Sequence, residues 1–215
     1  MAPPRKHGTD AILDATRALV LADGPRAASV AAIAAASGAP AGTLYHRFGS
    51  RDGVLTATWL RALERFQGPV LGASGPDALE TAVLMAVAAV GFARDLPDDA
   101  RLLLTIRPGD LLDGDSAEPL TAKIAAMNAP VGERLHTLAS ALYGSADPRA
   151  VDAVYRAVVD LPYAVIRRHT GAAPSWLADD VAAGVRALLI SAGRELETAL
   201  RVTPGRNSGT DPAPE

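Results

Sequence analysis

The most informative stretch of this 215-residue chain is residues 29–51, which read SVAAIAAASGAPAGTLYHRFGSR. Ser29 suits the cap of a helix that ends at Gly38, because glycine is common just after a helix C-terminus. Pro40 suits the opening of a second helix, which Gly49 ends. The stretch therefore predicts two helices of about two turns each, joined by a tight turn, which is the layout of a helix-turn-helix.

The second of these helices is expected to bury one face and to expose the other. At about 100° per residue, Leu44 and Phe48 fall on the same side, so we expect that side to pack against a core. The opposite side carries hydroxyl, imidazole and guanidinium groups, which donate hydrogen bonds to phosphate oxygens or reach base edges. With one residue from each flanking helix, the predicted DNA-binding residues are Ser29, Gly42, Thr43, Tyr45, His46, Arg47 and Arg51.

A further helix is predicted before this pair, from the candidate cap Thr9 to the break at Gly24. Its buried stripe is Ile12, Leu13, Thr16, Leu19 and Val20. Residues 1–8 are expected to form a flexible basic arm that contains Arg5 and Lys6. Residues 1–51 hold six basic and three acidic residues, whereas the whole chain has a formal charge of −3. This distribution favours contact of the N-terminal region with phosphates.

Helical periodicity continues to the C-terminal region and no strand pattern appears, so the fold class is predicted to be all-α. The further helical segments are expected at 51–67, 76–95, 97–106, 116–142, 147–169 and 175–201. We interpret residues 9–55 as a helix-turn-helix domain and 56–201 as a larger helical domain for ligand binding and dimerisation. Residues 202–215 have no periodicity and are expected to be a disordered tail.

The larger domain is expected to bury most of its apolar residues in a core, while a minority line a cavity for a small molecule. The candidate ligand-binding residues are Trp59, Phe66, Met85, Phe92, Met127, Tyr155 and Tyr163. Pro162 interrupts the 147–169 segment, and it either shapes this cavity or only bends the helix around the core.

The last two helical segments are expected to form a dimer interface. The final segment carries apolar residues with glycines among them, at Val181, Gly184, Val185, Leu188, Leu189, Gly193, Leu196 and Leu200. Small residues allow close helix approach, so the pair of segments suits a four-helix bundle with a second copy.

The pattern Ser29-x3-Ile33-Ala34-x3-Gly38-x4-Thr43-Leu44-Tyr45-x2-Phe48-x-Ser50-Arg51 resembles the DNA-binding domain of the tetracycline-repressor (TetR) family. The resemblance covers roughly residues 9–60. It implies a homodimer that pairs through its last two helices and a body that holds a small-molecule inducer.

By position, the resemblance implies phosphate contacts for Thr43 and Tyr45 and a role in operator choice for His46 and Arg47. Arg51 stands where the family usually has a phosphate-binding lysine. The chain departs from the family pattern at Ala31, Ala32 and Pro40, which replace charged residues and a serine cap. These departures predict fewer phosphate contacts in this protein.

Other classes of protein find little support in the sequence. There is no cysteine, the four histidines are scattered, and no metal-binding or nucleophile motif occurs, so no catalytic residue, metal site or cofactor is expected. Two adjacent acidic pairs, Asp98–Asp99 and Asp179–Asp180, are expected to serve helix dipoles. The N-terminus lacks the apolar core of a signal peptide, and a cytoplasmic protein is expected.

The sequence thus predicts a ligand-responsive transcriptional regulator, expected to be a repressor. It would bind a near-palindromic operator as a homodimer and be released by a small apolar or amphipathic effector. The alternatives are a helical small-molecule-binding or interaction protein without DNA binding, and a helical enzyme.

Overall fold

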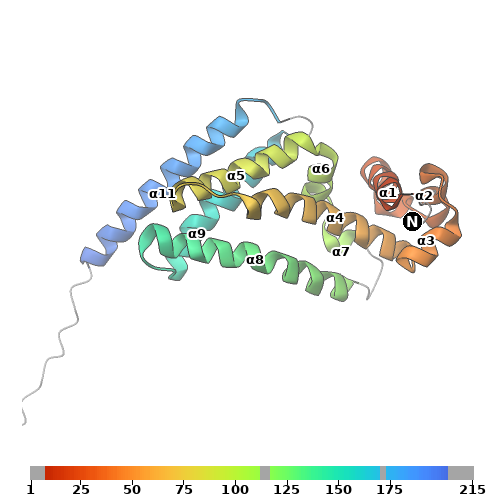
Figure 1. Ribbon diagram of the computed structural model, residues 1–215, viewed down its shortest axis with the longest axis horizontal. Coiled ribbons are helices and arrows are strands. Elements are labelled where there is room, and N and C mark those ends of the chain that lie inside the picture. Colours follow the sequence, from red (N-terminus) through yellow and green to blue (C-terminus); the bar gives the residue numbers. More distant parts are fainter. Residues whose placement is uncertain (1–7, 112–116, 170–172, 203–215) are drawn as a thin grey trace, which may run out of the picture.

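The computed structural model describes residues 8–111, 117–169 and 173–202, and every regular element in these ranges is helical (Figure 1). The predicted all-α fold is therefore confirmed. Most of the predicted basic arm and the predicted tail lie outside the described residues. No described helix combines the length and the hydropathy needed to span a bilayer.

Three short helices form the N-terminal head of the molecule: α1 (Thr9–Asp23), α2 (Val30–Ser37) and α3 (Ala41–Phe48). The Ser29 hydroxyl caps α2 by accepting a hydrogen bond from the backbone N–H of Ala32 at 3.1 Å, as predicted. Gly38 ends α2 with a φ of 69°, a conformation that favours glycine. The predicted cap at Thr9 is wrong, because Gly8 occupies the cap position and Thr9 is the first helical residue.

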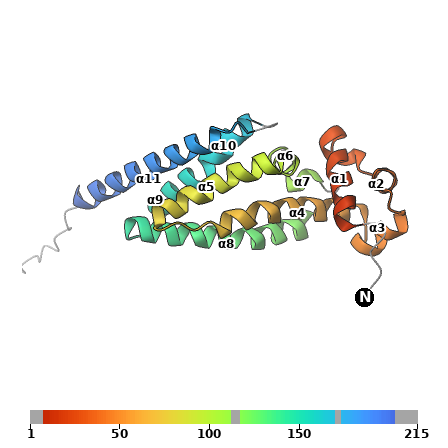
Figure 2. The same ribbon diagram turned by 45° about the horizontal axis from the view of Figure 1, so that its top comes forward.

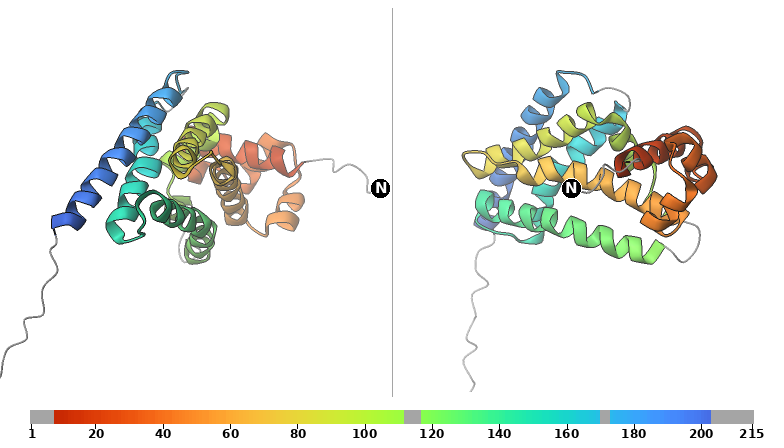
Figure 3. Two further views of the ribbon diagram at one scale, coloured as in Figure 1. Left: turned by 60° about the vertical axis from the view of Figure 1, so that its left-hand side comes forward. Right: turned by 45° about the vertical axis from the view of Figure 1, so that its right-hand side comes forward.

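The remaining helices form the body. They are α4 (Arg51–Gly72), α5 (Ala78–Asp95), α6 (Pro97–Thr105), α7 (Pro108–Leu111), α8 (Ala117–Tyr143), α9 (Pro148–Tyr155), α10 (Leu161–Arg168) and α11 (Leu177–Val202). Their bounds agree with the predicted segments to within a few residues, except that α7 was not predicted. The body helices lie side by side, and α11 lies on the side remote from the head (Figures 2 and 3).

Helix α4 belongs to both parts of the molecule. Ser50 caps it by accepting a hydrogen bond from the backbone N–H of Gly53 at 3.0 Å, directly after α3 ends. One core cluster joins Ile33 and Leu44 of the head with Leu55 of α4 and Leu102 of α6. A displacement of α4 or α6 is therefore transmitted to the head through direct packing.

The predicted 147–169 helix is interrupted. A π-helical turn over Arg156–Asp160 separates α9 from α10. Pro162 has no N–H to bond the carbonyl one α-helical turn earlier, so a wider turn before it leaves fewer backbone groups unsatisfied. Single π-helical turns are frequent at functional sites.

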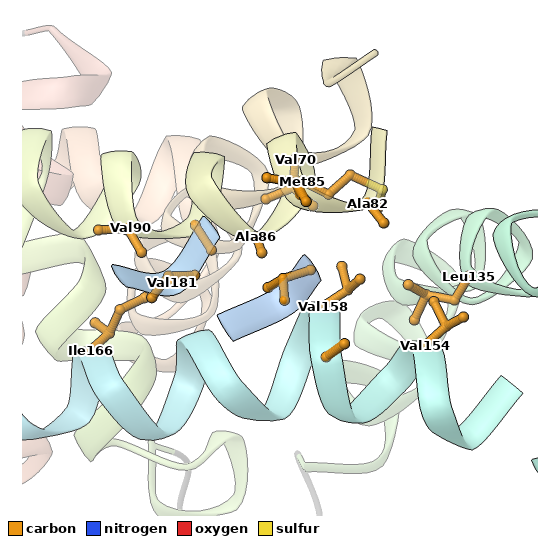
Figure 4. Packing of buried hydrophobic residues seen from close by; sticks show 14 of the residues in the cluster. Val70, Ala82, Met85, Ala86, Val90, Leu135, Val154, Val158, Ile166 and Val181 are labelled. Atoms are coloured by element: carbon orange, nitrogen blue, oxygen red, sulfur yellow. The ribbon is translucent and has the colours of Figure 1, made fainter. Parts of the chain in front are cut away.

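Helix α11 packs its apolar face inside its own chain. Val181, Val185 and Leu189 are nearly fully buried in the core cluster of the body, and Val181 lies near Ile166 of α10 (Figure 4). The assignment of these three residues to a dimer interface is therefore wrong. Leu188 is exposed on the same helix.

Candidate DNA-binding face and ligand cavity

Helix α3 has the two faces that its sequence predicts. Leu44 is only 1% exposed and Phe48 packs against the same core cluster. On the other side, Tyr45 is 55% exposed and His46 is also exposed. The helix thus presents polar and aromatic groups on a face that the rest of the head leaves uncovered.

A hollow of about 660 Å³ lies beside this face. Its lining residues are Thr9, Gly42, Thr43, His46, Arg47 and Phe48. Four of them are among the predicted DNA-binding residues, and the space beside Gly42 is open, because nothing lies within 4 Å of where a Cβ would be. Thr9 was missed as a site residue, since sequence reasoning treated it only as a cap.

The other three predicted residues lie away from the hollow. Tyr45 is exposed on another side of α3. The Ser29 hydroxyl is engaged as the cap of α2. The Arg51 guanidinium donates to the backbone oxygens of Ala28, at 3.1 Å, and Pro25, at 2.6 Å, and pairs with Asp52. Arg51 therefore ties the start of α4 to the segment that connects α1 and α2.

Gly53 permits a close contact between α3 and α4. A Cβ at this position would lie 1.9 Å from the Phe48 carbonyl oxygen. Because the obstacle is backbone rather than the end of a flexible side chain, any larger residue would push the C-terminus of α3 away from α4. A change in the position of α4 would therefore also move the C-terminal end of α3.

A buried carboxylate joins the head to the body. Asp99 of α6, whose side chain is 1% exposed, pairs with Arg17 of α1 and with Arg65 of α4, the second at 3.0 Å. The hydrogen bond to Asp99 raises the pKa of Arg65. The prediction that Asp98 and Asp99 serve only the helix dipole is thus incomplete, because Asp99 is also an ion-pair centre for three helices.

A second set of ion pairs extends this junction. Arg61 of α4 pairs with Asp10 at 2.8 Å and with Asp14 at 2.7 Å, both on α1. The hydrogen bond from Arg61 lowers the pKa of Asp10. The first helix of the head is therefore held to α4 as well as to α6.

The body contains a cavity of about 380 Å³ between α4, α5, α6, α8 and the α9–α10 region. Six of the seven candidate ligand-binding residues line it: Trp59, Phe66, Met85, Phe92, Tyr155 and Tyr163. The seventh, Met127, packs against the core cluster nearest the head, while the next residue, Asn128, lines the cavity. Pro162 also lines it, so the interrupted helix contributes to the cavity wall.

Two side-chain amides are the polar feature of the cavity that sequence reasoning missed. Gln67 Nε2 donates a hydrogen bond to Asn128 Oδ1 at 2.7 Å, and Gln67 is only 6% exposed. A signal for Gln67 was present, because it follows Leu60 and Leu63 at helical spacing and interrupts their buried stripe with a polar group. Asn128 gave no comparable signal.

Comparison with known proteins agrees with this description. Residues 12–58 match the family model for bacterial regulatory proteins of the tetR family. No curated protein sequence matches the chain significantly.

Three solved structures show the same overall fold. A tetR-family regulatory protein from Rhodococcus RHA1 has a TM-score of 0.69 and 19% identity, with 86% of this chain and 96% of that chain covered. PfmR, a TetR family regulator from Thermus thermophilus, has a TM-score of 0.61 and 22% identity, covering 84% and 97%. FadR from Bacillus subtilis, solved in complex with stearoyl-CoA, has a TM-score of 0.54 and 17% identity, covering 88% and 97%.

The matched residues are those that build the head, and the structural likeness extends over the body. Residues 12–58 of this chain therefore match the N-terminal domain of the tetR family of bacterial regulatory proteins, and the whole chain has the all-helical fold of the TetR-like transcriptional regulators.

Proposed function

We propose that this protein is a ligand-responsive transcriptional repressor that binds a near-palindromic operator as a homodimer. The observation that carries the proposal is the uncovered face of α3, where polar groups border a hollow against the first turn of α1. A short helix of this kind fits a major groove about 12 Å wide.

The hollow suits the sugar-phosphate backbone. Thr9, Thr43 and Arg47, whose side chains carry hydroxyl and guanidinium groups, line it, and the N-terminal end of α1 adds a positive dipole. His46 is exposed on the same side of α3, so we assign it to base edges. Tyr45 is assigned to a separate backbone contact. Arg51 is assigned first to holding α4 against the head. A phosphate contact by the same side chain would come in addition to that role.

The homodimer is proposed to form through the outer surfaces of α10 and α11. Exposed small residues, Ala164, Ala183, Ala187 and Ser191, lie on these two helices. Because α11 lies on the side of the body remote from the head, pairing there leaves both heads open to DNA (Figure 1). Two heads spaced about 34–36 Å apart would meet successive major grooves on one side of the duplex.

The release mechanism is proposed to run through α6. One part of α6 lines the cavity with Ala100, Leu103 and Leu104, and another holds Arg17 of α1 through Asp99. An effector that fits better when α6 moves would therefore reorient the head and lower operator affinity. The Bacillus subtilis neighbour was solved with a small molecule, stearoyl-CoA, which supports a ligand-binding role for this fold.

The experiment that tests the proposal is selection from a pool of random duplexes with the purified full-length protein at low salt. Enrichment of a near-palindrome is the expected result. Failure to enrich any sequence would overturn the regulator and leave the alternative, a helical ligand-binding protein without DNA binding.

A further inference from the structure

The cavity in the body has an uncharged lining. Among the described residues that line it, none is acidic or basic, and most are aliphatic or aromatic. Phe66 and Phe92 meet edge to face on one wall, with ring centroids 5.4 Å apart. An ionised group buried here would lose its hydration without gaining a partner of opposite charge, which is a costly exchange. The lining thus favours a neutral occupant.

The amide pair supplies the polar anchor. After Gln67 Nε2 has donated to Asn128 Oδ1, the pair still offers one free carbonyl oxygen on Gln67 and one free NH2 on Asn128. No residue that the structure describes donates to the Gln67 oxygen, and the residue as a whole is 6% exposed. If the oxygen and nitrogen positions of both amides are exchanged, Asn128 donates to Gln67, and the pair again has one free NH2 and one free carbonyl oxygen. The conclusion is therefore independent of how the amides are assigned.

Because Gln67 lines a largely apolar cavity, its carbonyl oxygen is available to a hydrogen-bond donor on a bound molecule, so this arrangement points to a ligand group that completes it. Gln67 and Asn128 both line the cavity, and they stand on different helices, α4 and α8. A group that bonded both amides would therefore connect these helices.

We infer that the effector is an uncharged, mainly hydrocarbon or aromatic molecule that carries one carboxamide-type group, and that this group pairs with Gln67 and Asn128. Such a group has one acceptor and one donor side by side, which complements the pair. The apolar remainder occupies the space beside Phe66, Phe92 and Met85. The inference rests on the proposed role of this cavity as the effector site.

The size of the cavity agrees with this class. A volume of about 380 Å³ is near the lower end of the range for small-molecule sites, roughly 300–1,000 Å³. A CoA thioester such as the one bound to the Bacillus subtilis neighbour carries several phosphate charges, for which this lining has no cationic partner. This protein is therefore expected to differ from that neighbour in ligand class.

The test compares matched probes by calorimetry on the full-length protein without DNA. Decanamide offers the donor and the acceptor, methyl decanoate offers acceptors only, decanoate is charged, and decanoyl-CoA carries phosphates. We expect decanamide to bind about tenfold more tightly than methyl decanoate, the size of one net hydrogen bond, and more tightly than either charged probe.

Two variants make the result specific. Gln67→Met keeps the length of the side chain, and Asn128→Ala changes an exposed residue. Each is expected to abolish the preference for decanamide while the affinity for methyl decanoate stays within about twofold. Tighter binding of decanoate, a preference that survives both variants, or no binding of any probe would overturn the inference. Because these measurements contain no DNA, a failed duplex selection and a failed ligand class are distinguished.

Discussion

The Asp99 carboxylate of α6 accepts a hydrogen bond from Arg65 Nη1 of α4 at 3.0 Å, and its other oxygen pairs with Arg17 of α1. A single buried group thereby fixes the head against the two body helices that also line the cavity. Any movement of α6 must carry Arg17 with it or break this contact. The junction thus connects two helices that line the cavity directly to α1 of the head.

Asp99→Asn is expected to destabilise the fold by about 3 kcal/mol, because Arg17 and Arg65 lose the charge that compensates their partial burial. Asp98→Asn is the matched control, since Asp98 is 65% exposed and lies 3.9 Å from Arg17. The free energy of unfolding in urea measures both variants. Equal losses would contradict the assignment of Asp99 as the centre of the junction.

Gly53→Ala is expected to destabilise the protein by about 1–3 kcal/mol, because the new Cβ would meet the Phe48 carbonyl oxygen at 1.9 Å. Gly42→Ala is its control on the neighbouring helix. Nothing lies within 4 Å of that position, so alanine should raise stability there by up to about 1 kcal/mol. Thermal unfolding distinguishes the two, and a Gly53→Ala protein as stable as the wild type would refute the close contact.

Ala187→Arg is expected to convert the proposed dimer into monomers. Ala187 is exposed on α11, and a long charged side chain there would keep the α11 helices of two copies from packing closely. Ala126→Arg on the outer side of α8 is the control, expected to remain dimeric. Sedimentation velocity reports both. A point substitution is preferable to deletion of residues 175–201, because α11 contributes Val181 and Val185 to the core of its own chain.

Acid is expected to weaken the attachment of α11 to α5. Arg186 Nε and Nη2 donate to the two oxygens of Glu80, at 2.9 and 2.8 Å, and these hydrogen bonds lower the pKa of Glu80. Because the pKa of Glu80 is lower in the folded state, its ion pair contributes its full stabilisation of the fold at pH values above the ordinary glutamate pKa of about 4.3. That stability is lost as the pH falls through the folded-state pKa.

Glu80→Gln should therefore lower the urea midpoint at about pH 6, and the difference from wild type should shrink by about pH 3. Chemical denaturation at both pH values makes the comparison. If the urea midpoints of wild type and Glu80→Gln differed by the same amount at both pH values, Glu80 would contribute to stability by packing rather than by charge.

Local patterns predicted most of the fold and part of the site. Leu44 and Phe48 were predicted to be buried because helical periodicity depends on sequence spacing alone. Six of the cavity-lining residues were found because large apolar and aromatic side chains in a helical body either fill the core or border a cavity.

The remaining features depend on distant parts of the chain. Asp99 meets Arg17 across 82 positions, and Gln67 meets Asn128 across 61, so neither pair has a local signal. The same holds for Arg51, whose basic character fits a phosphate contact but whose neighbours in space are backbone oxygens. Whether an apolar residue of α11 faces its own core or a second copy also depends on where α5 lies.

The central claim is that the uncovered face of α3 binds DNA, and the affinity of full-length Tyr45→Ala for the selected duplex tests it most directly. Tyr45 is 55% exposed, so the variant should unfold at the wild-type temperature. Fluorescence anisotropy over a range of salt concentrations is expected to show affinity that falls with salt, and at least about tenfold weaker binding by the variant. Wild-type affinity of Tyr45→Ala at every salt concentration would contradict the claim.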